Sequence, residues 1–279
     1  MQDIIFYNDR FISCDTPFIG AGSRALRYGD GLFETLRLIN GSIRHAELHF
    51  SRLFDGMHLL AFEVPATFTT QWLSDQIIAT AKKNKVEKAA RIRVAVFRAN
   101  GGLYDPEHHR PNIVIQTWPL PPQAGTLNSN GLVTGIFPSA RKSCDVFSNI
   151  KSSSHLTYVM AALYAKQQRW NDAMVLNCHD RISDSSIANV FTIKNKVITT
   201  PPLSEGCVAG IMRRFLLREL PQYGFNVVEK PLTPQDIESA DECFLTNAIS
   251  GIRWVKEFEK KTFTNSMIQE LFEQFVVIM

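Results

Sequence analysis

A proline-rich segment at residues 119–125 constrains the fold of this chain more than any other feature. Its sequence, Pro-Leu-Pro-Pro-Gln-Ala-Gly, holds three prolines and one glycine in seven residues. Proline lacks a backbone N–H and fixes φ, so neither a helix nor a central strand can continue through this segment. We therefore expect an interdomain linker at 119–125, between a small domain at 1–118 and a larger domain at 126–279.

Hydrophobic periodicity indicates that both domains mix helices and strands. In the first domain, a turn at Asn8-Asp9 separates two short apolar runs, as in a β-hairpin. Apolar residues then recur at helical spacing, which predicts helices from about residue 46 and over 70–83. In the second domain, apolar runs alternate with helical patterns at 155–169 and 211–223. The sequence therefore predicts an α+β fold with a small α+β N-terminal lobe, a larger mixed α/β C-terminal lobe and a ligand cleft.

The composition excludes several classes of function. There are 30 Lys and Arg against 27 Asp and Glu, and this net charge of +3 is too small and too scattered for a nucleic-acid interface. The longest mainly apolar stretch, 156–165, is far shorter than the roughly 20 residues that a membrane-spanning helix needs. We expect a soluble, cytoplasmic protein that binds neither nucleic acid nor membranes, while small anionic ligands stay open.

The cysteine and histidine spacings predict no metal site. The chain has five cysteines and no CxxC motif, which argues against a disulfide framework and a zinc site. His45 and His49 lie one helical turn apart, and His108-His109 form an adjacent pair. No nearby carboxylate or cysteine completes a ligand set around either pair.

Two local patterns point to chemistry. Lys151 lies between Ile150 and a run of serines, where partial desolvation would lower its pKa and free its amine for Schiff-base formation. Gly210 directly precedes an amphipathic helical pattern, whose first N–H groups could bind a phosphate. Ordinary readings remain open for both: a solvated lysine, and a glycine turn before a helix.

Arginines are concentrated on one predicted strand. Arg91 and Arg93 share a face of this otherwise apolar strand, and buried arginines need carboxylate or phosphate partners. The alternative is an edge strand whose arginines point to solvent. Gly29 and Gly31 around Asp30 indicate a tight backbone passage before another strand.

Read together, six segments resemble the class IV aminotransferase family, the fold-type IV enzymes that use pyridoxal 5'-phosphate (PLP). They occur in the family's order and cover nearly the whole chain. The segments are 28–37 (YGDGLFETLR), 49–53 (HFSRL), Lys151, 182–191 (ISDSSIANVF), 200–203 (TPPL) and 210–213 (GIMR).

The resemblance implies a role for each matching residue. Lys151 corresponds to the catalytic lysine that binds the PLP aldehyde as a Schiff base, and Arg52 to an arginine that binds its phosphate. The other implied cofactor contacts are Asp184, Asn189, Gly210, Ile211, Met212, Asn247 and Ala248. The residues implied to bind a small anionic amino substrate are Tyr28, Phe33, Arg37, Arg93 and Arg98. A homodimer is also implied.

Asp184 departs from the family pattern. Relatives usually have a glutamate here, whose carboxylate keeps the pyridine nitrogen of PLP protonated so that the ring can draw electrons. Aspartate is one methylene shorter, so it must approach the ring more closely or act through water. The alternative is that Asp184 only caps a turn in the sequence Ser-Asp-Ser-Ser.

Four positions bear on which reaction of the family this chain performs. Thr35, Met212 and Asn247-Ala248 resemble 4-amino-4-deoxychorismate lyases, and Leu156 stands where branched-chain aminotransferases have a tyrosine. We therefore favour a lyase that forms p-aminobenzoate and pyruvate. The alternative is a branched-chain or D-amino acid aminotransferase. A third possibility, a relative that only binds PLP or a partner protein, is disfavoured by the presence of Lys151.

Overall fold

The structure is a computed structural model that describes residues 3–277. These residues form two compact units. Unit 1 comprises residues 3–122 and 150–154, and unit 2 comprises 123–149 and 155–277. The boundary at 122/123 falls inside the segment predicted to be a linker. None of the helices within the described part of the chain is long and apolar enough to cross a bilayer.

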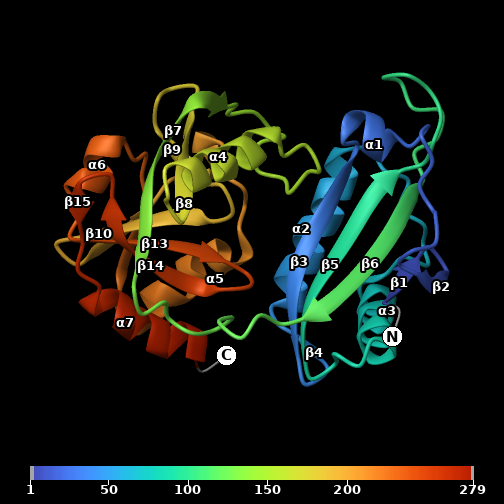
Figure 1. Ribbon diagram of the computed structural model, residues 1–279, viewed down its shortest axis with the longest axis horizontal. Coiled ribbons are helices and arrows are strands. Elements are labelled where there is room, and N and C mark those ends of the chain that lie inside the picture. The colour runs from blue at the N-terminus through green and yellow to red at the C-terminus, as the bar shows by residue number, and fades with distance from the viewer. Residues whose placement is uncertain (1–2, 278–279) are drawn as a thin grey trace. The chain divides into compact units, whose positions relative to one another are not determined.

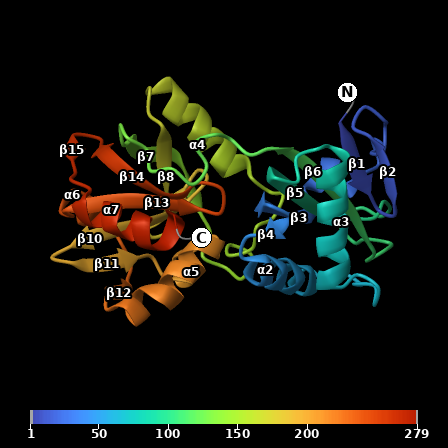
Figure 2. The same cartoon turned by 90° about the horizontal axis from the view of Figure 1, so that it is seen from below.

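Unit 1 is a six-stranded antiparallel sheet with two long helices on one face (Figures 1 and 2). The strand order is β2-β1-β6-β5-β3-β4. The strands are β1 (Ile4–Tyr7), β2 (Arg10–Ser13), β3 (Gly31–Ile39), β4 (Ser42–Ile43), β5 (Ala89–Arg98) and β6 (Pro111–Pro119). The helices are α1 (Arg24–Tyr28), α2 (Ala46–Leu59) and α3 (Thr70–Lys83). The hairpin at the N-terminus and the two helices predicted from residue 46 and over 70–83 are confirmed.

Alternation along β3 explains how the sheet of unit 1 divides its side chains. Leu32, Leu36 and Leu38 are buried in the core that packs against α2 and α3. Because successive side chains of a strand point to opposite faces, Phe33 and Arg37 lie on the face away from these helices. Glu34 belongs to the helix-facing set, so a carboxylate enters an otherwise apolar layer.

The segment 150–154 pairs with the start of β3. The N–H of Phe33 donates to the carbonyl of Lys151 at 3.0 Å, and the N–H of Ser153 donates to the carbonyl of Gly31 at 2.8 Å. The sequence-based domain boundaries placed these residues in the large domain. The structure differs because this hydrogen bonding joins residues more than 110 positions apart, which no local pattern reveals.

Unit 2 is built on a nine-stranded mixed sheet. Eight strands follow the order β12-β11-β10-β13-β14-β7-β8-β9, and β15 pairs with β14. The strands are β7 (Leu132–Lys142), β8 (Asp172–Asn177), β9 (Ile182–Ser185), β10 (Asn189–Lys194), β11 (Val197–Thr200), β12 (Asn226–Glu229), β13 (Glu242–Asn247), β14 (Gly251–Phe258) and β15 (Lys261–Thr262). The pairs β7–β8, β7–β14 and β11–β12 are parallel.

Helices surround the sheet of unit 2 (Figure 2). They are α4 (Leu156–Gln167), α5 (Ile211–Glu219), α6 (Pro234–Glu238), α7 (Ser266–Phe272), the 3-10 turns η1 (Leu203–Glu205) and η2 (Leu220–Tyr223), and the π-helical turn η3 (Glu273–Val277). The predicted helix over 211–223 is α5 continued by η2, because Pro221 cannot donate to the α-helical ladder. Inside the sheet, the stacked rings of Phe191 and Phe244 lie 4.9 Å apart.

Candidate functional site

A buried carboxylate in unit 1 holds two side chains of α2. Glu34 is 1% exposed, and its Oε1 and Oε2 accept hydrogen bonds from Nε and Nη2 of Arg52 at 2.8 and 2.6 Å. Oε2 also lies 2.6 Å from Nδ1 of His49. His49 and Arg52 are three residues apart, so they share one face of the helix. Glu34 therefore fixes the orientation of the Arg52 guanidinium.

Charge balance in this cluster is set by burial and by Arg52. Burial alone would raise the pKa of Glu34, but Arg52 and His49 outweigh it and lower that pKa to about 2. Burial lowers the pKa of His49, and the nearby charges of Arg52 and Lys151 add to this effect against the pull of Glu34. At neutral pH, Glu34 is ionised and His49 is neutral, donating its Nδ1–H to Glu34.

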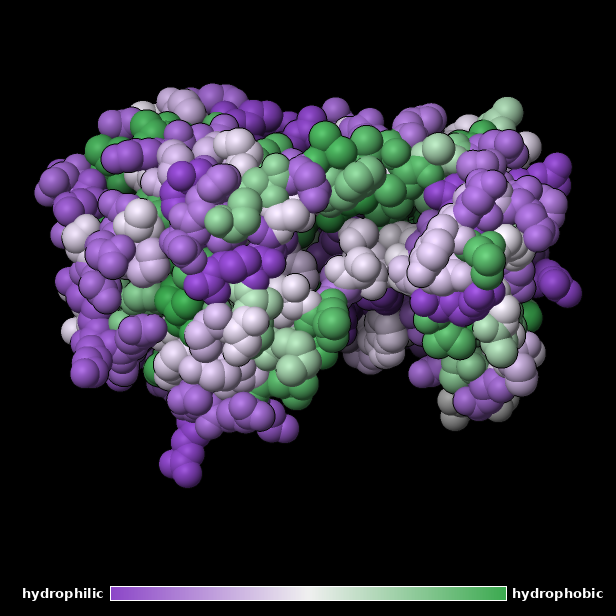
Figure 3. All heavy atoms as spheres, turned by 90° about the horizontal axis from the view of Figure 1, so that it is seen from above, coloured by the Kyte–Doolittle hydropathy of each residue, from purple (hydrophilic) through white to green (hydrophobic). Residues whose placement is uncertain are grey.

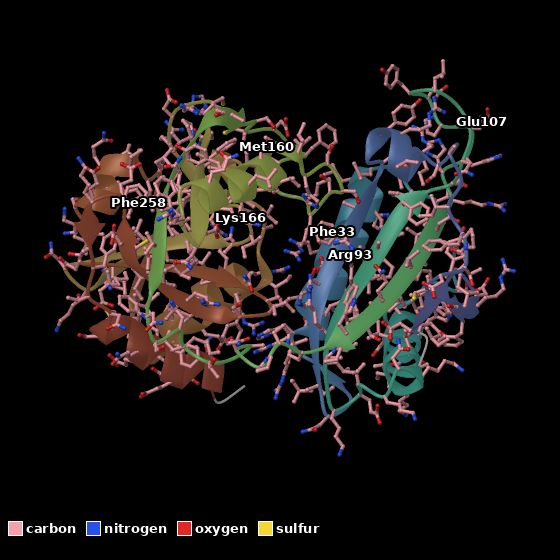
Figure 4. All side chains as sticks on the ribbon, viewed as in Figure 1. Phe33, Arg93, Glu107, Met160, Lys166 and Phe258 are labelled. Atoms are coloured by element: carbon pink, nitrogen blue, oxygen red, sulfur yellow. The ribbon has the colours of Figure 1, made fainter. Side chains whose placement is uncertain are left out.

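Lys151 and Arg93 both contact the ring of Phe33. The Nζ of Lys151 lies 4.6 Å from the ring centroid, and the Cζ of Arg93 lies 4.0 Å from it. Phe33 and Arg93 come from the adjacent strands β3 and β5, and Figure 4 shows them side by side. The predicted catalytic lysine and two of the predicted substrate residues are therefore neighbours in unit 1.

The face of the unit 1 sheet away from α2 carries three arginines. Arg37 on β3 is paired in register with Arg91 on β5, and Arg93 lies two residues further along β5. Within residues 3–277, no carboxylate forms an ion pair with any of the three. Burial, and then a neighbouring arginine, lower the pKa of Arg37 and of Arg93. The edge-strand alternative is wrong about the strand, because β5 lies between β3 and β6, but Arg91 is exposed to solvent, as that alternative expected.

Arg98 and Tyr28, which the resemblance implied to bind substrate, contact other residues of the protein. The Nε of Arg98 donates to the Asp30 carboxylate at 3.0 Å, and its Nη1 and Nη2 donate to the carbonyls of Ala61 and Leu60. Its guanidinium therefore fixes the chain around Asp30 rather than facing a ligand. Tyr28, at the end of α1, stacks with the guanidinium groups of Arg24 and Arg27. Substrate contacts by Arg98 and Tyr28 stay predictions that these bonds do not favour.

In unit 2, Asp184 is a buried carboxylate with one acceptor still available. Asp184 is 3% exposed, and its Oδ2 accepts from the Tyr158 hydroxyl at 2.8 Å, the Val208 N–H at 3.0 Å and Nζ of Lys142 at 3.3 Å. Its Oδ1 is buried and has no hydrogen-bond partner among the described residues. Asp184 lies within β9, so the turn-cap alternative is wrong. A buried carboxylate oxygen of this kind calls for an N–H or O–H donor.

The Asp184 carboxylate also affects the pKa of its neighbour Tyr158. Burial, followed by the charge and hydrogen bond of Asp184, raises the pKa of Tyr158 well above its ordinary value. Tyr158 therefore stays protonated and serves as a donor. Because three groups converge on Oδ2, the carboxylate is held in one orientation and Oδ1 points in a fixed direction.

The loop before α5 offers free backbone N–H groups. Gly210 is the N-cap of α5 and supplies no side-chain hydrogen bond to it. The first amides of any α-helix have no partner inside the helix, so those of Ile211 and Met212 suit an anion. Asn189 holds the loop, because its Nδ2 donates to the Val208 carbonyl at 2.8 Å. A Cβ at position 210 would lie 1.8 Å from Oδ1 of Asn189, which explains the glycine.

The turn after β13 contains Asn247 and Ala248. The Oδ1 of Asn247 accepts from the N–H groups of Ile249 and Ser250 at 3.0 and 2.8 Å. The side chain of Asn247 is thus used to shape the turn, and a ligand contact by Asn247-Ala248 stays a prediction.

Sequence reasoning missed several residues of these two clusters. Glu34 and His49 lie inside the quoted motifs, and a signal was present for Glu34: a carboxylate at a position where β3 alternation demands an apolar side chain. Lys142, Tyr158 and the Val208 amide had no comparable signal, since they meet Asp184 only through the folding of unit 2.

Most of the chain matches one known protein family. The model of the family described as Amino-transferase class IV matches residues 31–258. The chain belongs to the class IV aminotransferase family. This confirms the resemblance, and the family's use of PLP identifies the cofactor.

Relatives within the family have different names. A Methanocaldococcus jannaschii protein, provisionally named a branched-chain-amino-acid aminotransferase, is 28% identical and covers 96% of this chain and 92% of its own. The aminodeoxychorismate lyase of Vibrio harveyi is 27% identical, and the match covers 83% of this chain and 84% of the lyase. The branched-chain aminotransferase structure from Thermoproteus uzoniensis superposes with a TM-score of 0.89 at 22% identity. The superposition covers 99% of this chain and 95% of the aminotransferase chain. The α+β fold-type IV prediction is confirmed, whereas the preference for a lyase is not.

Proposed function

We propose that this class IV aminotransferase-family enzyme binds PLP through Lys151 and acts on an amino-bearing substrate with more than one carboxylate. The observation that carries the cofactor part is the buried Oδ1 of Asp184, an acceptor fixed in direction and lacking a described donor. The protonated pyridine nitrogen of PLP is a donor of the required kind. The shorter aspartate thus fulfils the role for which relatives use a glutamate.

The phosphate would be bound by charge and by backbone amides. The amides at the start of α5 supply directed N–H donors, and Arg52, held by Glu34, supplies a fixed positive charge. Lys151 follows Asn149 by two positions in the chain, and the side chain of Asn149 donates to the carbonyls of Leu203 and Cys207 in the same loop region. These hydrogen bonds fix the chain at Asn149 to the loop that precedes α5.

The residues of this chain would then transfer one proton during the reaction. PLP, when bound, makes a hydrogen on the amine-bearing substrate carbon acidic. The Nζ of Lys151 accepts that proton as a general base and can return it elsewhere. Asp184 keeps the ring nitrogen protonated, and Tyr158, Lys142 and the Val208 amide keep Asp184 in place.

The arginine face supports the substrate class. Arg37, Arg91 and Arg93 lie on one sheet face without a carboxylate partner among residues 3–277, which is more than a substrate with one carboxylate requires. 4-Amino-4-deoxychorismate carries two carboxylates. Loss of the proton from its amine-bearing ring carbon, with cleavage of the ether C–O bond, would give aromatic p-aminobenzoate and release enolpyruvate as pyruvate.

An aminotransferase is the second candidate, favoured by the names of the relatives and by the structural likeness. Purified holoenzyme should be mixed with 4-amino-4-deoxychorismate and, separately, with panels of L- and D-amino acids. The lyase proposal predicts p-aminobenzoate release without rapid conversion of the cofactor to its amine form. Fast conversion with an amino acid and no p-aminobenzoate would instead establish an aminotransferase, and neither activity should survive in Lys151→Ala.

We further propose that the enzyme is a homodimer that uses the exposed face of α4. Leu156, Val159, Met160 and Leu163 are 75%, 52%, 45% and 49% exposed and follow helical spacing. Apolar side chains also gather in patches on the face shown in Figure 3, and Met160 is labelled on α4 in Figure 4. A row of four large apolar side chains on one helix is typical of an interface.

Light scattering tests the dimer. Val159→Glu would place a charge in the apolar row, so we expect the dimer to dissociate to a 31.6 kDa monomer at concentrations where the wild type stays dimeric. Lys82→Glu, at an exposed position on α3, should leave the mass unchanged. A monomeric wild type, or a dimer unaffected by Val159→Glu, would refute this interface.

A further inference from the structure

A cluster of metal-binding side chain types in unit 2 takes no part in the proposed reaction. Cys144, Cys178 and His179 place their sulfur and ring nitrogen atoms within 4.8 Å of one another. The two cysteines are 34 positions apart in the sequence, so their spacing resembled no known ligand motif. The fold brings them together because β7 and β8 are parallel and end in register, with Lys142 paired to Asn177.

The backbone that presents these side chains is well fixed. The Oδ1 of the fully buried Asn177 accepts from the N–H groups of His179 and Arg181 at 2.9 and 3.1 Å, which closes the turn. The N–H of Cys178 donates to the Lys142 carbonyl at 3.0 Å. The carboxylate of Glu205 in turn accepts from Nδ2 of Asn177 at 2.6 Å. The turn therefore holds Cys178 and His179 beside Cys144 without help from a ligand.

The chemical types of the three donor atoms determine which metal ion this cluster would prefer. Two thiols and an imidazole are soft to intermediate donors, which favour Zn²⁺ or Cu⁺ over Mg²⁺ or Ca²⁺. Tetrahedral zinc sites have Zn–S bonds of about 2.3 Å and Zn–N bonds of about 2.0 Å, so their ligand atoms lie roughly 3.5–4 Å apart. The three donor atoms already lie within 4.8 Å of one another, and Cys178 and His179 are exposed, so packing does not fix their side chains.

We propose that Cys144, Cys178 and His179 bind one Zn²⁺ ion, with water as the fourth ligand. The ion would join the chain after β7 to the turn after β8. The same region contacts the loop that reaches Asp184, because a Cβ on Gly206 would lie 2.3 Å from the Ser143 carbonyl and 3.5 Å from the Cys144 sulfur. Zinc binding would therefore stabilise unit 2 near the Val208 amide, and it is independent of the reaction proposed above.

Metal titration of the reduced, PLP-loaded protein tests this site. Zn²⁺ affinity should be measured in competition with a chromophoric chelator, and Co²⁺ should be added as a spectroscopic probe. We expect one Zn²⁺ per chain, thiolate-to-cobalt charge-transfer absorption, and a melting temperature that rises with added Zn²⁺. Cys144→Ser, Cys178→Ser and His179→Ala should each weaken Zn²⁺ binding at least tenfold.

Two matched controls make the result specific. Cys14→Ser removes an exposed thiol and His108→Ala an exposed imidazole outside the cluster, and both should bind Zn²⁺ like the wild type. Cys178 and His179 are exposed, so their variants should fold. Absence of zinc binding by the reduced protein, or affinity that is unchanged in the Cys144 and Cys178 variants, would overturn the proposal. None of these readouts depends on catalytic activity.

Discussion

At the scale of single residues, two buried carboxylates organise the side chains of the proposed site. Glu34 is held by Arg52 and His49, and Asp184 by Tyr158, Lys142 and a backbone amide. Both are buried, so each depends on its partners for the stability of its charge. They differ in one respect: Glu34 uses both oxygens within the described protein, whereas Asp184 keeps Oδ1 available.

The Glu34 cluster predicts a specific dependence of stability on pH. The pKa of Glu34 falls from 4.5 to about 2 on folding. Because the pKa is lower in the folded state, ionised Glu34 stabilises the fold at any pH above the unfolded-state pKa. This stabilisation is lost as the pH falls from about 4.5 to 2. At 1.36 kcal/mol per unit, the difference corresponds to about 3 kcal/mol. Unfolding in urea at pH 6 and pH 3 should show that Glu34→Gln removes most of this acid sensitivity.

Glu270→Gln, on the exposed side of α7, is the matched control and should keep the wild-type pH profile. We also expect Glu34→Gln to retain PLP more weakly at neutral pH, because Arg52 loses its charged partner. Identical acid sensitivity in Glu34→Gln and the wild type would mean that other carboxylates control stability in this range.

Asp184 predicts a separation of cofactor content from turnover. Asp184→Asn keeps the size of the side chain but can no longer keep the pyridine nitrogen protonated, so we expect turnover to fall about 100-fold while bound PLP changes little. Absorbance of the bound cofactor and steady-state kinetics measure the two quantities. Asp180→Asn, in the exposed turn after β8, should behave like the wild type. A fully active Asp184→Asn enzyme would reduce Asp184 to a structural role.

At the scale of elements, helices were predicted more accurately than strand partners. The helical pattern over 70–83 matches α3, because an apolar stripe and the Thr69 N-cap are both local signals. β5 extends from Ala89 to Arg98, and the ladders with β3 and β6, rather than a local pattern, determine its length. The contact between the 150–154 segment and β3 was invisible for the same reason.

The start of α5 is the element most sensitive to substitution. Gly210 has an ordinary φ of −64°, so an alanine is acceptable to the backbone, but its Cβ would meet Asn189 at 1.8 Å. Gly210→Ala should therefore displace the loop, lower stability by about 2 kcal/mol and weaken PLP retention. Gly22→Ala, where the added Cβ meets nothing within 4 Å, is the control. Thermal melts and PLP dissociation rates give the comparison, and wild-type retention in Gly210→Ala would contradict this role.

At the scale of the whole molecule, the family and fold could be predicted from the sequence, but the site only in part. The positions of Lys151, Arg52 and Asp184 came from motif resemblance, and the spare oxygen of Asp184 needed the packing of unit 2. The Cys144–Cys178–His179 cluster lay beyond prediction, since it depends on the register of two parallel strands. The reaction itself is not encoded in the fold, because lyases and aminotransferases share this family.

The central claim is that Lys151 carries the cofactor, and borohydride reduction followed by peptide mass spectrometry tests it most directly. Lys142 is the natural competitor, because its Nζ lies 3.3 Å from the Asp184 carboxylate. PLP-loaded protein, once reduced, should carry a single phosphopyridoxyl group on Lys151, and Lys151→Arg should carry none. A modified Lys142 with an unmodified Lys151, or no fixed cofactor in the wild type, would contradict the account.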